Sequence, residues 1–315
     1  MDTISLRNEY YKLNTSFKKK FIFHLGSDAG FFSEYNNMIL AMLYCLTNKI
    51  QFILYSEDAN FSYQKGWTDY FCPFCDEVFD DFHKKYNFRD YEFIQQKLGK
   101  IDKLKIKSYK FINGIDFLTQ DLWLLIRSRD HETEIYNIPE LDIINSSLRE
   151  ACKILISITW HYNDDAKALV KSKIDLLKLP SEYLGFHIRR GDKYIEQKTS
   201  ETYLYFEKIK NLSLRNIFIS TDDYNTILEI KNGQYLQYNF FSLCREDQTG
   251  YDQNQYKILN KNQLKENQID LFTSIDILSN SQFFVGTFSS NIGMFLGMKM
   301  DAKKSVSVDI DWRIW

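Results

Sequence analysis

Short apolar segments alternate with amphipathic segments along the C-terminal half of the chain. Each apolar segment has the length of a buried strand, and each amphipathic one repeats apolar residues at helical spacing. The predicted strands are Tyr183–Ile188, Asn216–Ser220, Tyr238–Leu243, Phe283–Thr287 and Ser305–Ile310. The predicted helices are Thr202–Lys210, Tyr224–Lys231, Gln263–Ser281 and Ser289–Met300. Such strict alternation predicts a parallel sheet with helices on both faces.

The N-terminal half opens in the same way and then becomes less regular. Strand Lys20–Leu25, turn Gly26–Gly30, helix Ser33–Asn48 and strand Ile50–Tyr55 together predict the start of a Rossmann-like half. Further helices are predicted at Phe117–Arg127, Pro139–Trp160 and Asp164–Leu177. We therefore expect an α/β protein of two Rossmann-like domains, residues 1–178 and 179–315, facing across a cleft. Ligands of such sheets bind beyond the carboxyl ends of the strands.

Composition and charge narrow the functional classes. The 315 residues include 40 basic and 42 acidic ones, and this balance lacks the basic excess of nucleic-acid-binding proteins. No apolar stretch precedes Lys18, and no apolar run is long enough to cross a bilayer. We expect a cytoplasmic protein without a secretory signal or transmembrane segment. Cys72 and Cys75 have ligand-like spacing, but with His83 as the nearest further candidate we favour two thiols in an aromatic loop over a metal site.

The first candidate motif joins a strand to a charged turn at Gly185–Lys193. Side chains alternate along a strand, so His187 and Arg189 point to the same face. A guanidinium fork matches two phosphate oxygens and suits a diphosphate. A solvated surface turn or a structural Arg–Asp pair would explain one arginine. The five polar or charged residues here favour a functional site, and they are His187, Arg189, Arg190, Asp192 and Lys193.

Two further motifs also follow predicted strands. Asp222 and Asp223 could bind a nucleobase or ribose, pair with the arginines, or cap the next helix. Thr287, Ser289 and Ser290 lead into a helix whose N-terminus favours an anion, although either serine could be a plain cap. Neither GxGxxG nor a Walker GxxxxGK[ST] motif occurs, which disfavours nicotinamide-dependent enzymes and P-loop NTPases.

In order and spacing these motifs resemble those of α1,6-type fucosyltransferases and their bacterial nodulation-factor relatives. The matching segments read HIRRGDK from His187, FISTDD from Phe218 and VGTFSSN from Val285. They also resemble motifs of the wider superfamily, which includes α1,2- and protein O-fucosyltransferases, and the lysine after Asp192 favours the α1,6 branch. The resemblance covers the C-terminal half well. In the N-terminal half it is weaker and uses residues 24–30, 66–71 and 159–164.

The resemblance implies a GT-B fold, with residues 1–178 on the acceptor side and residues 179–315 binding the GDP-sugar. It implies transfer of L-fucose from GDP-fucose to an oligosaccharide or glycoconjugate, with inversion and without metal or cofactor. It assigns the β-phosphate to Arg189, loop support to Arg190, the guanine side to His187 and a diphosphate contact to Ser290. Asp192, Asp222 and Asp223 match acidic residues that the family needs, and Thr287 and Ser289 belong to the matched third motif.

Two departures from the family leave alternatives open. The guanine-binding aspartate aligns with Ser274, with Asp270 and Asp276 as the nearest substitutes, so another GDP-deoxysugar remains a candidate donor. The family's proposed base aligns with Gln197, so we assign the base to Glu196, assisted by Lys193, and keep Glu201 as the substitute. A non-catalytic glycan- or nucleotide-binding protein on the same scaffold is the third hypothesis.

Residues of the N-terminal half could contribute to the acceptor side. His24 could line it, although a buried strand-end histidine is the favoured interpretation. Trp67 and Trp123 could stack on sugar rings, although most such aromatic residues belong to the core. The acceptor and linkage would depend on loops whose sequence carries no motif.

Overall fold

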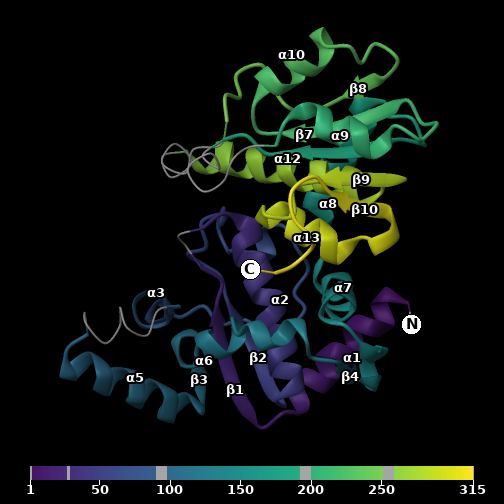
Figure 1. Cartoon of the computed structure of the whole chain (residues 1–315). Helices are drawn as coiled ribbons and strands as arrows, with labels where there is room; N and C mark the ends of the chain where they lie inside the picture. Colours follow the sequence, from purple (N-terminus) through teal and green to yellow (C-terminus); the bar gives the residue numbers. More distant parts are fainter. Residues whose placement is uncertain (1, 27–28, 90–97, 192–199, 251–258, 315) are drawn as a thin grey trace. The chain divides into compact units, whose positions relative to one another are not determined.

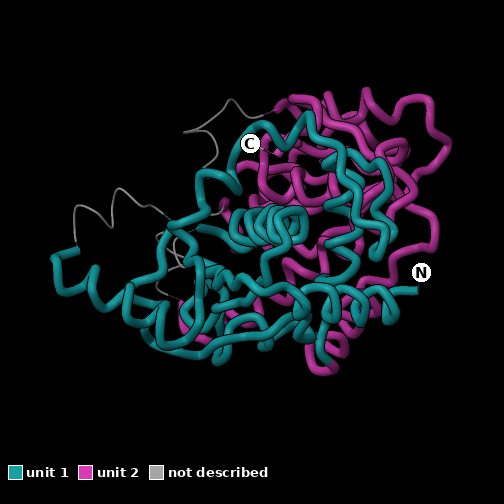
Figure 2. Tube along the Cα trace, turned by 90° about the horizontal axis from the view of Figure 1, so that it is seen from below, with its two compact units in different colours: residues 1–163 teal, residues 164–315 magenta. Residues whose placement is uncertain are grey.

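The computed structural model of the chain describes residues 2–26, 29–89, 98–191, 200–250 and 259–314 (Figure 1). The chain divides into two compact units, Met1–Asn163 and Asp164–Trp315, which Figure 2 shows in different colours. This division lies one helix before the boundary expected at 178/179. Helix α8 (Asp164–Leu177) packs against α12 (Lys261–Ser279) of the second unit, and Lys173 Nζ lies 2.6 Å from Asp270 Oδ1.

Unit 1 contains a three-stranded parallel sheet of order β2-β1-β3. Its strands are β1 (Lys19–His24), β2 (Ile50–Tyr55) and β3 (Phe117–Leu118). Helix α2 (Phe31–Thr47) connects β1 to β2 and is buried along most of its length. Helix α7 (Leu148–Thr159) packs on α2, and α1 (Thr3–Ser16) packs on α7. The strand, helix and strand predicted at the start of the N-terminal half are therefore confirmed, and the predicted turn between the first two lies partly outside the described residues.

One predicted helix of unit 1 is wrong. The segment 139–160 forms a 3-10 turn η3 (Pro139–Leu141), strand β5 (Ile143–Ser146) and helix α7, and β5 pairs antiparallel with β4 (Tyr136–Ile138). Asp142 and Asn145 have φ values of 57° and 47°, which a right-handed helix cannot accommodate. The remaining elements of the unit are η1 (Trp67–Asp69), α3 (Asp81–Tyr86), α5 (Lys100–Asn113), α6 (Thr119–Ile126) and η2 (Arg129–Glu132).

Unit 2 is built on a five-stranded parallel sheet of order β10-β9-β6-β7-β8. The strands are β6 (Leu184–Ile188), β7 (Asn216–Thr221), β8 (Asn239–Phe241), β9 (Phe283–Gly286) and β10 (Ser305–Ser307). With α8 and α12, its helices are α9 (Thr202–Ile209), α10 (Tyr224–Asn232), α13 (Asn291–Lys299) and the 3-10 turn η5 (Ala302–Lys304). The predicted strand–helix alternation is confirmed.

The strand order of unit 2 brings the three motifs to one edge of the sheet. From β6 the chain proceeds outward through β7 and β8, and then β9 pairs on the opposite side of β6. Such a reversal is a topological switch point, beyond which ligands of doubly wound sheets bind. Ile188 pairs with Thr221, and Phe186 pairs with Val285, so the three strands end at about the same level. The turns after β6, β7 and β9 therefore meet there.

Candidate functional site

Arg189 is held at the carboxyl end of the central strand β6 by a carboxylate of the neighbouring strand. Its Nη1 donates a short hydrogen bond to Asp222 Oδ2, and the backbone N–H of Arg190 donates to Asp222 Oδ1 at 2.8 Å. The two side chains of the ion pair are 19% and 17% exposed, so the charges are partly desolvated yet reachable. A planar guanidinium oriented in this way keeps its charge, and its geometry matches that of phosphate oxygens.

The side chain of Arg190 forms hydrogen bonds with the segment that leads into α9. Its Nη1 donates to the carbonyl oxygen of Ser200 at 2.6 Å and its Nη2 donates to the hydroxyl of Thr202 at 3.0 Å. These bonds fasten the start of α9 to the end of β6. The predicted site residues Asp192, Lys193 and Glu196 lie outside the described residues.

The two aspartates of the second motif make different contacts. Asp222 pairs with Arg189, as one of the three interpretations of this motif proposed. Asp223 is the N-cap of α10, where its Oδ1 accepts hydrogen bonds from the backbone N–H and the side-chain amide of Asn225, both at 3.0 Å. A direct contact of either aspartate with a base or ribose stays a prediction.

The third motif forms a tight turn between β9 and α13. Ser290 is a buried N-cap, and its Oγ accepts the N–H of Gly293 at 3.0 Å and donates to the carbonyl of Thr287 at 2.8 Å. The hydroxyl of Thr287 lies 3.4 Å from the same Oγ. The capping interpretation of Ser290 therefore describes its present contacts, and its contact with a diphosphate stays a prediction.

Asp309 is a carboxylate beside the third motif that the sequence analysis did not single out. It accepts hydrogen bonds from the N–H of Phe288 at 2.9 Å, the hydroxyl of Ser289 at 2.5 Å and the N–H of Ile310 at 2.7 Å. A carboxylate of the chain itself thus accepts hydrogen bonds from groups of the β9–α13 turn that the sequence analysis expected to bind an anion. Arg189 therefore remains the clearest candidate for binding a phosphate, and that role stays a prediction. The sequence analysis placed Asp309 inside the predicted strand Ser305–Ile310, whereas β10 ends at Ser307, so no sequence signal marked it.

His187 is the second-last residue of β6 and lies just before this edge of the sheet. Its side chain is almost completely buried, and burial lowers its pKa to about 4, against the raising effect of Asp222. The ring is therefore neutral near pH 7. Its Nδ1 has no hydrogen-bond partner among the described residues. A neutral ring with one unsatisfied nitrogen is compatible with the predicted place near the guanine, which stays a prediction.

The candidate base-recognition residues lie one turn apart on α12. Asp270 contacts Lys173 of α8 and accepts a hydrogen bond from Arg245 Nη1 at 3.0 Å, so its charge is compensated within the unit. Ser274 is buried on the same helix, and Asp276 follows it. Arg245 is a cation beside this helix that the sequence did not single out. Which of these groups reads a base stays a prediction.

The side chains singled out in unit 1 are mostly structural. His24 is buried, with its Nδ1 bound to the carbonyl of Asn87 and its Nε2 2.8 Å from Asp58 Oδ1, so both ring nitrogens are engaged. Trp67 is fully buried, which excludes it from sugar stacking in this conformation. Trp123 lies beneath the guanidinium groups of Arg89 and Arg127, at 5.0 and 5.7 Å from its ring centre.

The cysteine pair also fits the structural interpretation. Cys72 Sγ donates to the carbonyl of Tyr162 at 3.3 Å, Cys75 is buried, and His83 Nε2 lies 2.9 Å from the hydroxyl of Tyr109. Over the described ranges no group of three or more His, Cys, Asp or Glu side chains could hold a metal ion. In the same residues no helix is long and apolar enough to cross a membrane.

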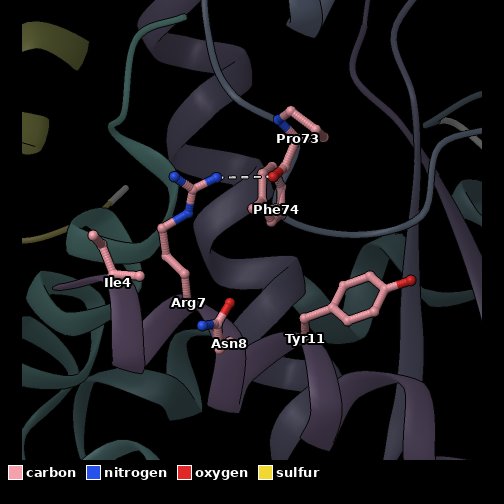
Figure 3. A pocket seen from close by; sticks show the side chains of 6 residues that line it. All are labelled: Ile4, Arg7, Asn8, Tyr11, Pro73 and Phe74. Carbon is pink, nitrogen blue, oxygen red and sulfur yellow. Dashed lines mark hydrogen bonds between the residues drawn. The ribbon is translucent and has the colours of Figure 1, made fainter.

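Unit 1 also contains a surface pocket beside α1. Figure 3 shows it between α1 and the Pro73–Phe74 segment, where Arg7 Nη2 donates to the carbonyl of Pro73 at 2.8 Å. Its lining is Ile4, Arg7, Asn8, Tyr11, Pro73 and Phe74.

The two α/β units with their parallel sheets match the GT-B class of folds. No model of a known protein family and no curated protein sequence matches the chain. Solved structures do match. NodZ α1,6-fucosyltransferase soaked with GDP-fucose superposes with a TM-score of 0.53 at 14% identity, over 90% of this chain and 93% of that one.

Two other solved structures share the fold. A mutant of Arabidopsis thaliana FUT1 in complex with GDP has a TM-score of 0.51 at 14% identity, over 93% of this chain and 73% of that one. The apo form of POFUT1 has a TM-score of 0.50 at 12% identity, over 92% and 97%. The fold predicted from the motifs, that of the GDP-fucose-dependent fucosyltransferases, is therefore confirmed.

Proposed function

We propose that the protein is an inverting, metal-independent fucosyltransferase of the α1,6 type, which moves L-fucose from GDP-fucose to a hydroxyl of an oligosaccharide or glycoconjugate. The observation that carries the proposal is the position of Arg189 at the switch point of the unit 2 sheet, with its guanidinium oriented by Asp222. The motif resemblance and the shared fold support the choice of donor.

We assign stabilisation of the departing nucleotide to residues at the carboxyl end of β6. As the bond between the sugar and GDP breaks, negative charge grows on the diphosphate, and a fixed guanidinium stabilises it without reorganisation. Asp222 fixes this guanidinium, and Arg190 fixes the following segment through Ser200 and Thr202. In the proposed complex the donor phosphates bind Arg189, and neutral His187 lies on the base side.

Inversion requires the acceptor hydroxyl to attack the face of the anomeric carbon opposite the diphosphate. A carboxylate that accepts the proton of this hydroxyl speeds the attack. We assign this role to Glu196, with Lys193 adjusting its loop. Glu201, the exposed N-cap of α9, is the substitute candidate.

The donor is tested by measuring GDP release from a panel of GDP-sugars in the presence of EDTA. We expect release from GDP-fucose at a rate that EDTA does not change. Preferential release from another GDP-sugar would contradict the fucosyl assignment and favour the alternative that Ser274 raised. No release from any donor, even with mixed glycan acceptors, would contradict enzymatic function and favour a glycan- or nucleotide-binding protein.

The base is tested by Glu196→Gln, which we expect to lower turnover about a hundredfold while leaving GDP affinity unchanged, because only proton transfer is lost. Turnover is measured by GDP release with acceptor present, and affinity by calorimetry. Glu207→Gln, an exposed carboxylate paired with Lys210, is the matched control and should behave as the wild type. Unchanged turnover in Glu196→Gln, or a loss confined to Glu201→Gln, would remove Glu196 from this role.

A further inference from the structure

Helix α5 of unit 1 is attached to its unit by one narrow face. Ile106 and Tyr109 pack against the cluster around Ile22 and Leu118, and Asp102 accepts a hydrogen bond from Tyr86 at 3.0 Å. Positions 102, 106 and 109 recur at helical spacing, so they form a single stripe. No residue of α5 is fully buried, and Figure 1 shows the helix as a separate rod beside the sheet of unit 1.

The opposite face of α5 exposes large apolar side chains to solvent. Phe111 is 89% exposed, Ile112 77%, Ile101 72% and Leu104 64%. At 100° per residue these four side chains occupy an arc of about 100° that points away from the attached stripe. Ser108 is the polar residue within this arc. A largely apolar exposed face of this kind indicates an interaction surface.

Lysines border this apolar face on both sides. The helix carries five lysines and one acidic residue, and that residue, Asp102, lies on the attached side. At helical spacing Lys100 and Lys107 flank the face on one side and Lys105 flanks it on the other. Apolar residues with flanking lysines are the pattern of helices that lie in a membrane interface.

We propose that α5 docks the protein on the surface of a bilayer that contains anionic lipids. The four apolar side chains enter the boundary of the acyl chains, and the lysines contact lipid phosphates. Charge complementarity favours this partner over a second copy of the chain, because two α5 helices would place like charges face to face. The basic charge alone would also suit a nucleic acid. A nucleic-acid backbone, however, offers no apolar surface against which the arc between the lysines could be buried.

The test is co-sedimentation of the full chain with vesicles. We expect binding to vesicles of phosphatidylcholine with phosphatidylglycerol, and weak binding to phosphatidylcholine alone. Leu104→Gln with Phe111→Gln should reduce binding at least about tenfold, because apolar burial is lost. Lys105→Gln with Lys107→Gln should reduce it about thirtyfold at low salt.

Matched control variants distinguish binding through this face of α5 from non-specific binding of the protein to vesicles. Leu236 is 87% exposed in unit 2, and Lys303 and Lys304 are exposed there, so Leu236→Gln and Lys303→Gln with Lys304→Gln should bind vesicles as the wild type does. Thermal melts of every variant verify folding. Equal loss in the controls, or no loss in the α5 variants, would overturn the proposal. Self-association without lipid that Phe111→Gln abolishes would overturn it in favour of a second copy.

Discussion

Replacing Arg189 with alanine is expected to slow GDP release from GDP-fucose about a thousandfold, at the upper end of what one preorganised charge contributes. The guanidinium lies at the carboxyl end of β6 and is oriented by Asp222, so it is in place before the donor binds. Its interaction with the diphosphate strengthens as charge grows on the leaving group. The loss should therefore fall mainly on kcat, with a smaller rise in KM.

Two further variants make this prediction specific. Arg189→Lys keeps the charge but not the planar fork, so it should recover only part of the activity. Arg215→Ala removes an arginine at the amino end of β7 in the same unit, where Arg215 Nη1 bonds the carbonyl of Leu212, and should leave turnover unchanged. Rates are measured by GDP release and folding by thermal melts. Full activity in a folded Arg189→Ala protein would exclude Arg189 from the donor site.

Replacing Gly293 with alanine is expected to destabilise unit 2 by about 3 kcal/mol, a value typical of severe overpacking. A Cβ at this position would lie 1.9 Å from the carbonyl oxygen of Thr287 and 3.0 Å from Ser290 Oγ. The first of these atoms belongs to the backbone, so the turn between β9 and α13 would have to shift. The cap formed by Ser290 and the position of Thr287 would shift with it, and GDP affinity should fall as well.

The prediction is measured by urea unfolding and by calorimetric GDP binding. Gly99→Ala is the control, because a Cβ there would meet its nearest atom, an oxygen of Asp102, at 3.9 Å. That change should cost less than about 1 kcal/mol, the value for a weaker helix cap. Wild-type stability of Gly293→Ala would show that the turn can relax, and would remove the argument that Gly293 shapes the site.

The sequence predicted unit 2 well because the signals there are local. Apolar strands alternate with amphipathic helices, and the polar residues come directly after the strands. Parallel strands end at a common edge, so the order of elements alone was enough to bring Arg189, Asp222 and Thr287 near one another. The support role expected of Arg190 agrees with its bonds to Ser200 and Thr202, although its part in donor binding stays a prediction.

By itself the sequence determined the fold class, the strands of unit 2 and the edge at which its polar groups gather. Only the tertiary structure decided that 139–160 contains a strand, that α8 belongs with α12, and that Asp309 occupies donors of the β9–α13 turn. These features depend on partners distant in the sequence. The hydrophobic periodicity of a segment shows which of its sides is apolar, but not which other element will pack against that side. A sequence motif likewise shows its hydrogen-bond donors, but not a carboxylate distant in the sequence that accepts hydrogen bonds from them.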